Sequence, residues 1–321
     1  MRPAAFGFLM TMLGQDVGWP VPVGGSGQLT AALLNRARAA GAQIECNVAR
    51  IEVRGGRAVG VTTTEGRTVR VRRAVLADVI APRLFCDMLP ADAIPDGLRE
   101  EMKHYIWDPP VVKVNYALDR PIPWRAAGLR DVGTVHLGAD GDGLVRWMAD
   151  LNTRVVPEHP FMLLGQTTTA DPTRSPEGTE SVWAYTHLPR NVADDKSADG
   201  LAKSMDQVIE EHAPGFGSRV IGRFVQRPSD REASDANLHL GALNGGTAQL
   251  QQMLIFRPAR GMGRAETPVE GLYLGSASAT PGGSVHGACG RNAANAALAA
   301  DGWTGWPRRK LSRTVLSLLT K

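Results

Sequence analysis

Glycines gather in a stretch near the C-terminus where a ligand could press against the backbone. The segment TPGGSVHGACG places Gly282, Gly283 and Gly287 within a few residues, directly before a run of small residues at helical spacing. Glycine lets backbone approach a ligand without a side chain in the way, and a helix N-terminus offers unpaired N–H groups and a positive dipole end. This order of residue types favours a site for a small molecule that carries or gains negative charge.

A second glycine-rich segment, VPVGGSGQLTAALLNRARAAGAQIE, imitates the fingerprint of a dinucleotide-binding turn. Gly25 and Gly27 precede a helical pattern, and the acidic Glu45 follows further along the chain. Thr30, however, stands where Gly or Ala allows close packing of helix and strand, and prolines interrupt the strand that should come before the turn. The details favour an ordinary helix start, and a lone glycine pattern is weak support for the alternative.

The remaining reactive side chains form no recognisable catalytic or metal-binding set. The seven histidines show no HxxxH, HxH or HExxH spacing, and neither GGSG nor GSASA fits the GxSxG of a nucleophile elbow. We therefore expect no metal site. For His286 two interpretations stay open, a catalytic base or a side chain whose hydrogen bonding is satisfied at a helix start, because no neighbouring carboxylate in the sequence pairs with it.

Composition places the chain among ordinary globular proteins of one or two domains. It has 321 residues, of which 43% are hydrophobic, and its 36 basic and 32 acidic residues alternate without a concentrated basic stripe. Nucleic acid is therefore not an expected partner. Cys46, Cys86 and Cys289 form no CxxC pair, which argues against disulfides and dithiol chemistry and favours a reducing cytoplasm.

Both ends of the chain lack a membrane-spanning pattern, since no apolar run reaches the roughly 18 residues that a spanning helix needs. The opening 19 residues resemble a broken domain edge more than a signal peptide. The tail, 301–321, is basic and amphipathic, with one apolar helical face made by Leu311, Val315, Leu318 and Leu319. Peripheral contact with an anionic membrane and docking on its own domain both remain open for it.

Hydrophobic periodicity predicts the elements that must position these residues. A helix is expected from Gly27 to Ala40 with Gly41 as its left-handed cap, followed by a meander of strands that turns at Gly55-Gly56. A helical stretch follows at 96–105, beyond a domain boundary near Pro90.

The middle and last parts of the chain differ in pattern. Strand-like runs are expected at 111–118, 134–138, 161–169, 181–187 and 220–225, with a helix at about 198–212. From Gly271 onward a buried strand, a glycine turn and a helix of small residues are expected.

Two segments resemble FAD-dependent oxidoreductases of the phytoene desaturase and amine oxidase type. The first matches the pattern P-x-GG-x-x-x-L, a helix, G-A-x-I and N-x-x-V/I through Pro22, Gly24, Gly25, Leu29, Gly41, Ile44 and Asn47. The second, ETPVEGLYLGSASATPGGSVHGACGRNAANAAL, resembles the segment in which that family brings a glycine turn to the flavin. The resemblance extends from Val17 to about Ala300, and the middle of the chain is most similar to a little-characterised branch.

The resemblance implies FAD as the cofactor and assigns its contacts largely to backbone atoms. The residue that matches Val48 would hold the adenine, while Gly275 and Ser276 would contact the pyrophosphate and ribitol. Beneath the flavin ring it places Gly282, Gly283, Val285, His286 and Gly287. The chain departs from the family in two ways: no acidic residue stands near Ser276, and His286 replaces the proline usual in carotenoid desaturases. No catalytic side chain is assigned.

The expected fold is therefore α/β and α+β. It combines an incomplete FAD-binding domain of the glutathione reductase and amine oxidase type (17–90 and 261–300) with an antiparallel-sheet substrate domain (91–260). The expected activity is desaturase-like or dehydrogenase-like removal of hydride from a hydrophobic, isoprenoid-like or lipid-like substrate.

No GxGxxG unit precedes Val17, so we expect a fragment or a shortened relative that binds FAD poorly on its own. The competing hypothesis is a non-catalytic remnant that binds a lipid or a protein partner. The sequence does not define the oligomeric state.

Overall fold

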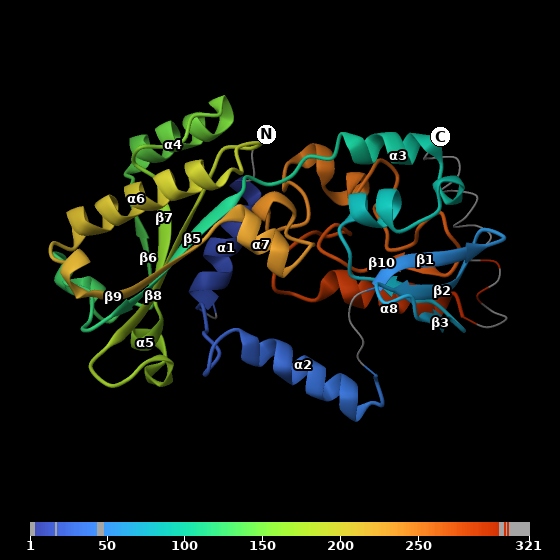
Figure 1. Cartoon of the computed structure of the whole chain (residues 1–321), viewed down its shortest axis with the longest axis horizontal. Coiled ribbons are helices and arrows are strands. Elements are labelled where there is room, and N and C mark those ends of the chain that lie inside the picture. Colours follow the sequence, from blue (N-terminus) through green and yellow to red (C-terminus); the bar gives the residue numbers. More distant parts are fainter. Residues whose placement is uncertain (1–3, 17, 44–47, 302–304, 306, 308–321) are drawn as a thin grey trace. The chain divides into compact units, whose positions relative to one another are not determined.

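The structure, a computed structural model, describes residues 4–16, 18–43, 48–301, 305 and 307 (Figure 1). The chain forms two compact units. Unit 1 consists of Glu45–Asp108 and Leu243–Lys321 together with Met1–Ala4, and unit 2 consists of Ala5–Ile44 and Pro109–Ala242.

A three-stranded antiparallel sheet forms the first part of unit 1, and its strands are β1 (Val48–Arg54), β2 (Arg57–Thr63) and β3 (Thr68–Arg70). Gly55 and Gly56 join β1 to β2 with φ angles of 57° and 74°. Two successive positive φ angles are what a two-residue hairpin turn of matching twist requires. The predicted meander and its glycine turn are confirmed.

A parallel pair, β4 (Val75–Ala77) and β10 (Leu272–Leu274), lies beside α8 (Ala288–Ala299) in unit 1. All three residues of β10 are buried, which confirms the predicted buried strand. The run from Thr68 to Ala77 contains two strands that belong to different sheets. The exposed Arg72 and Arg73 separate them.

The core of unit 1 includes segments that the sequence placed in the other domain. The helix α3 (Asp96–Lys103) contributes Leu98 and Met102, and the later segment contributes Ala259 and Met262, to the cluster that also contains the residues of β10. The boundaries therefore fall after residues 108 and 242 instead of near 90 and 260. The bounds of the units follow from which residues are buried in the same core, and sequence patterns do not show this.

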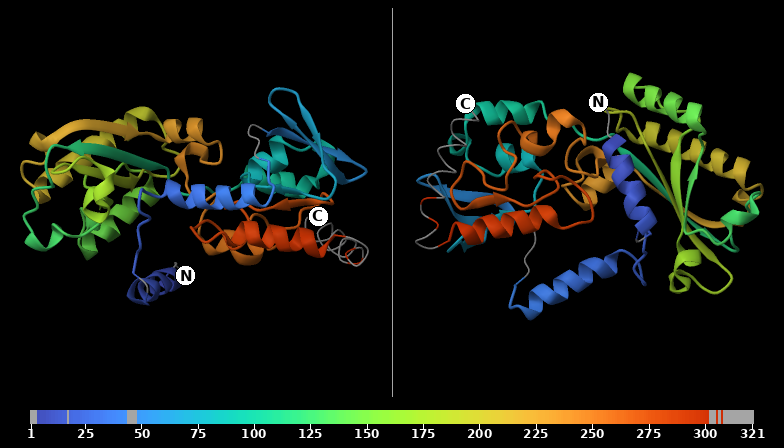
Figure 2. Two further views of the ribbon diagram at one scale, coloured as in Figure 1. Left: turned by 90° about the horizontal axis from the view of Figure 1, so that it is seen from below. Right: turned by 180° about the vertical axis from the view of Figure 1, so that it is seen from behind.

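Unit 2 is built on a five-stranded antiparallel sheet in the order β6-β7-β8-β5-β9 (Figure 2). All five strands fall where the sequence predicted strand-like runs. Their bounds are β5 Val111–Leu118, β6 Thr134–Leu137, β7 Met162–Gln166, β8 Glu180–His187 and β9 Val220–Gln226. The helices of this part are α4 Gly141–Thr153, α5 Thr167–Ala170, α6 Asp195–His212 and α7 Pro228–Ser234.

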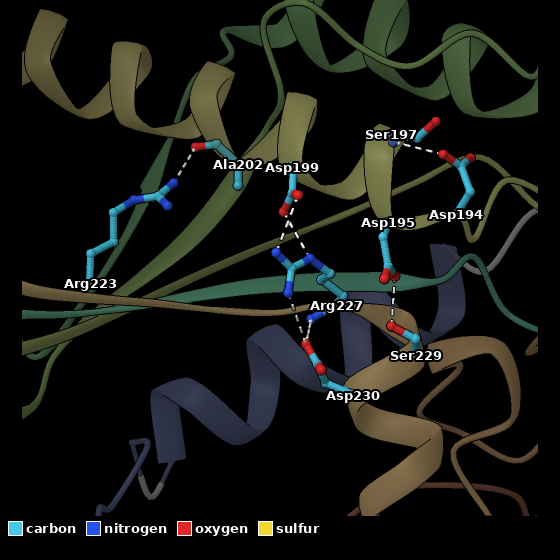
Figure 3. Close-up of polar contacts among 9 residues, drawn as sticks. All are labelled: Asp194, Asp195, Ser197, Asp199, Ala202, Arg223, Arg227, Ser229 and Asp230. Atoms are coloured by element: carbon cyan, nitrogen blue, oxygen red, sulfur yellow. Dashed lines mark hydrogen bonds and ion pairs between the residues drawn. The ribbon is translucent and has the colours of Figure 1, made fainter.

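One face of this sheet, the inner face, packs against α6 and carries the core of unit 2. Val112, Val114 and Leu118 of β5 are buried there with Leu201 and Met205 of α6. The strict alternation in β8, where every second residue is buried, leaves the other face partly exposed. Polar contacts also join α6 to β9 and α7 (Figure 3).

The helices α1 (Ala4–Asp16) and α2 (Gly27–Ala39) come first in the chain, before the strands of both units. The structure confirms the predicted α2 and the left-handed Gly41 after it, whose φ is 86°. The segment before α2 is held within unit 2, because the backbone N–H of Gly24 donates a 2.6 Å hydrogen bond to Asp171. The sequence assigned this segment to the 17–90 portion of an FAD-binding domain, and that assignment remains a prediction.

The helices that the structure describes include none long and apolar enough to cross a membrane. The apolar face predicted for the tail, from Leu311 to Leu319, lies outside the described residues, as do Ile44 and Asn47 of the first matching segment.

Candidate functional site

The glycine turn, Gly275–Gly287, connects β10 to α8. Its start is fixed by β4, since the N–H of Gly275 donates a 2.9 Å hydrogen bond to the carbonyl of Ala77. A Cβ added at Gly275 would lie 3.4 Å from Ala293, so the strand end packs directly on α8. The turn brings together every predicted site residue except Val48.

Glycine serves two different purposes within this turn. A Cβ at Gly283 would lie 2.9 Å from Asn244, so this glycine is required by the fold itself. Gly282 and Gly287 have positive φ angles of 116° and 62°. Nothing lies within 4 Å of a Cβ at Gly287, which leaves open space directly at the start of α8.

The hydroxyl groups of Ser276 and Ser278 are engaged inside the protein. The Ser276 side chain is only 3% exposed, and its Oγ accepts a 3.2 Å hydrogen bond from the N–H of Ser278. Ser278 Oγ in turn donates to the carbonyl of Gly245 at 2.7 Å and accepts from the N–H of Ala81. The carbonyl of Ser276 is engaged as well, since it accepts a 2.9 Å hydrogen bond from the N–H of Ala279.

Arg257 lies beneath the turn and is 2% exposed. Its guanidinium donates to the carbonyl of Ala277 from Nε at 3.0 Å and from Nη2 at 2.6 Å. Further bonds reach the carbonyls of Asn244, Thr247 and Gln252 at 2.7, 3.0 and 3.4 Å. Among the described residues no carboxylate forms an ion pair with it, so four carbonyl groups satisfy the buried cation.

His286 and Val285 lie at the exposed end of the turn, and Val285 is 88% exposed. His286 Nδ1 accepts a 3.0 Å hydrogen bond from the N–H of Ala288, the first residue of α8. This contact supports the interpretation of His286 as a residue satisfied at a helix start. The same contact occupies one of the N–H groups at the start of α8, which begins at Ala288.

Val48 lies elsewhere in unit 1, at the first position of β1 opposite Thr63 of β2. Its assignment to the adenine remains a prediction.

The outer side of the sheet in unit 2 carries a second candidate site that the sequence did not single out. We call it the aromatic face, and its residues are Lys113, Asn115, Leu163, Trp183, Tyr185, His187 and Phe224. The strand register arranges most of them in two rows, Leu163-Tyr185-Lys113 and Gly165-Trp183-Asn115-Phe224.

Trp183 and Tyr185 form the centre of the aromatic face. Their rings stack with centroids 5.9 Å apart and an interplanar angle of 19°. A Cβ at Gly165 would overlap the indole of Trp183, so the ring lies across this glycine. Tyr185 also contacts His187 edge to face at 6.0 Å. The alternation in SVWAYTH predicts that Trp183 and Tyr185 share one face of a strand. The other residues of the face join them only through the pairing of strands.

The fold is of the type found in FAD-dependent amine oxidases, and the comparison of sequences agrees. Residues 4–298 match the flavin containing amine oxidoreductase family, and the chain belongs to this family. The resemblance stated from the sequence, and the fold class with it, are thereby confirmed.

Two curated relatives carry the description pyridine nucleotide-disulfide oxidoreductase domain-containing protein 2. The chain is 32% identical to the protein of Mus musculus and 31% identical to that of Rattus norvegicus, each over 302 residues. The match covers 88% of this chain and 51% of each relative, so the chain spans about half their length.

Solved structures support the fold. An oxidoreductase from Methanosarcina mazei matches with a TM-score of 0.52 and 16% identity, covering 86% of this chain and 55% of the other. Cyclohexylamine oxidase from Brevibacterium oxydans matches with a TM-score of 0.52 and 14% identity, covering 86% and 52%.

Proposed function

We propose that this chain provides the flavin-ring contacts and the substrate domain of an FAD-dependent oxidoreductase that removes hydride from a hydrophobic molecule. One observation carries the proposal: a turn of positive-φ glycines opens onto the start of α8, in a chain that belongs to a flavoprotein family. Bound FAD would supply a two-electron oxidant, since its isoalloxazine ring accepts a hydride from a substrate C–H bond.

The residues of the glycine turn fit such a group. The space at Gly287 and the N-terminus of α8 offer backbone N–H groups to negative charge. Gly275 would contribute backbone only. The buried Ser276 and Gly282, whose carbonyls accept hydrogen bonds from Ala279 and Cys289, would hold the shape of the turn. Beneath them Arg257, which no described carboxylate neutralises, would add positive potential under the ligand.

The aromatic face is the part of unit 2 that we assign to the substrate. Trp183, Tyr185 and Leu163 present a continuous apolar surface on rigid strands, whereas the opposite face of the sheet is filled by α6. Such a surface would bind a hydrophobic body and exclude water from it.

Reconstitution tests the proposal. The purified chain is incubated with excess FAD, desalted, and examined by visible absorption, with a Gly287→Val variant beside it. We expect a retained flavin band in the native chain and its loss in the variant, whose side chain would fill the space at the start of α8. A surface variant, Lys203→Met, serves as control. Colourless native protein would refute binding by this chain and leave the remnant that binds a lipid or a partner.

A further inference from the structure

Two basic side chains of unit 2 have no acidic partner among the residues that the structure describes. Lys113 is half-buried in β5 on the aromatic face, and Arg231 is half-buried in α7. Within the described part of the chain neither forms an ion pair, and the Nε of Arg231 is buried without a hydrogen-bond partner. Buried charges are ordinarily paired, so this arrangement calls for an explanation.

Neighbouring arginines are paired with carboxylates, and Figure 3 shows this for Arg227. Arg227 binds Asp199 of α6 through two hydrogen bonds of 2.9 and 3.2 Å, and Arg223 lies 2.8 Å from Asp206. Carboxylates on α6 therefore neutralise these two cations. Arg231, one helical turn beyond Arg227, has no such neighbour.

The fold brings the two unpaired cations together. Gln226, the last residue of β9, lies opposite Lys113 in the sheet, and α7 with Arg231 begins two residues later. Burial and, second, the charge of Arg231 lower the pKa of Lys113, and burial lowers the pKa of Arg231. Two like charges that are close and poorly hydrated attract an anion between them.

Apolar surface adjoins this pair of charges. Tyr185 lies directly opposite Lys113 in the register, stacks on Trp183, and lies opposite Leu163 on its other side. A ligand that satisfied the cations would therefore extend over aromatic and aliphatic groups.

We propose that Lys113 and Arg231 bind the carboxylate of an amphipathic molecule whose hydrocarbon body lies on Trp183, Tyr185 and Leu163. The site takes an anionic head group and disfavours a protonated amine, which would meet two like charges. The inference that this molecule is the substrate rests on the proposed function. The binding of the anion does not require FAD.

Head-group comparison tests this site in the full chain without flavin. Isothermal titration calorimetry is performed with octanoate, octan-1-ol and octylamine, which share one chain length and differ in charge at neutral pH. We expect octanoate to bind about tenfold more tightly than the alcohol, as one charge-assisted hydrogen bond would give, and the ammonium form to bind most weakly.

Variants assign the effect to residues. In Lys113→Met and in Arg231→Gln the affinity for octanoate should fall to that for octan-1-ol, while the affinity for the alcohol is retained. Lys203→Met, an exposed change on α6, should leave all three affinities unchanged. Circular dichroism confirms folding of each variant, and the comparison of head groups on the native chain holds even if a variant does not fold.

The outcomes separate this inference from the proposed function. Equal affinity for octanoate and octylamine, or equal losses for all three probes in Lys113→Met, would overturn the anion site even in a chain that retains FAD. A colourless chain that prefers octanoate would keep the anion site and refute the flavin proposal.

Discussion

The two units each contain an arginine with buried guanidinium atoms, and these atoms have different surroundings. In unit 1, Arg257 donates five hydrogen bonds to four main-chain carbonyls and holds two loops together. In unit 2, Arg231 keeps a buried Nε without a partner. One guanidinium is therefore a structural cross-link, and the other remains available to a ligand.

The same contrast runs through both candidate sites. The glycine turn presents main-chain groups whose positions depend on glycines and on packing beneath them, so its chemistry is largely independent of side chains. The aromatic face presents side chains brought into rows by strand register. Substitutions should consequently unfold or loosen the first site and change the specificity of the second.

The largest expected effect comes from removing Arg257. In Arg257→Met, buried carbonyls of Asn244, Thr247 and Ala277 lose their donors, and we expect the free energy of unfolding to fall by about 3 to 5 kcal/mol. Arg231→Met, the matched change, should alter stability by less than about 1 kcal/mol because no contact is lost. Urea denaturation followed by circular dichroism measures both. Similar losses of unfolding free energy in the two variants would contradict the different roles given to Arg257 and Arg231.

A smaller effect is expected where Trp183 crosses the sheet. Gly165→Ala would push the indole from its position, at a cost of about 1 to 3 kcal/mol, and would change tryptophan emission. Gly222→Ala in β9 is the control, since its Cβ would lie 3.5 Å from Ala117 in ordinary contact. Unchanged emission and stability in Gly165→Ala would show that the aromatic face is not packed as described.

The smallest effect concerns the start of α8. His286→Ala removes the acceptor for the N–H of Ala288 and should cost about 0.5 to 1 kcal/mol, as the loss of a helix cap does. His104→Ala, an exposed position after α3, should change stability less. If His286→Ala lost no stability in thermal denaturation, the 3.0 Å contact would have no role in holding the helix.

Local features could be predicted from the sequence. The hairpin at Gly55-Gly56, the left-handed Gly41 after α2, the buried β10 and the helix α8 each depend on residues within one short segment. Residue type and spacing fix such features before any long-range contact forms. The glycine turn, as the connection between two of them, was therefore found.

Features that depend on distant contacts could not be predicted. The buried position of Arg257 could not be predicted, because its hydrogen-bond acceptors are main-chain carbonyls. These carbonyls come close to Arg257 only when two loops fold. The pairing of Tyr185 with Lys113 is set by register between strands about seventy residues apart. The bounds of the two compact units depend on such contacts as well, since Leu98 and Met262 join one core only after folding.

The indole of Trp183 lying across Gly165 also constrains how this chain can diverge. The two positions occupy neighbouring strands, and any side chain at position 165 competes with the tryptophan for the same volume. Homologous sequences should therefore change them as a pair, with a glycine at one position accompanying a large ring at the other. Such paired variation would mark this patch of sheet in an alignment even where strand residues around it drift.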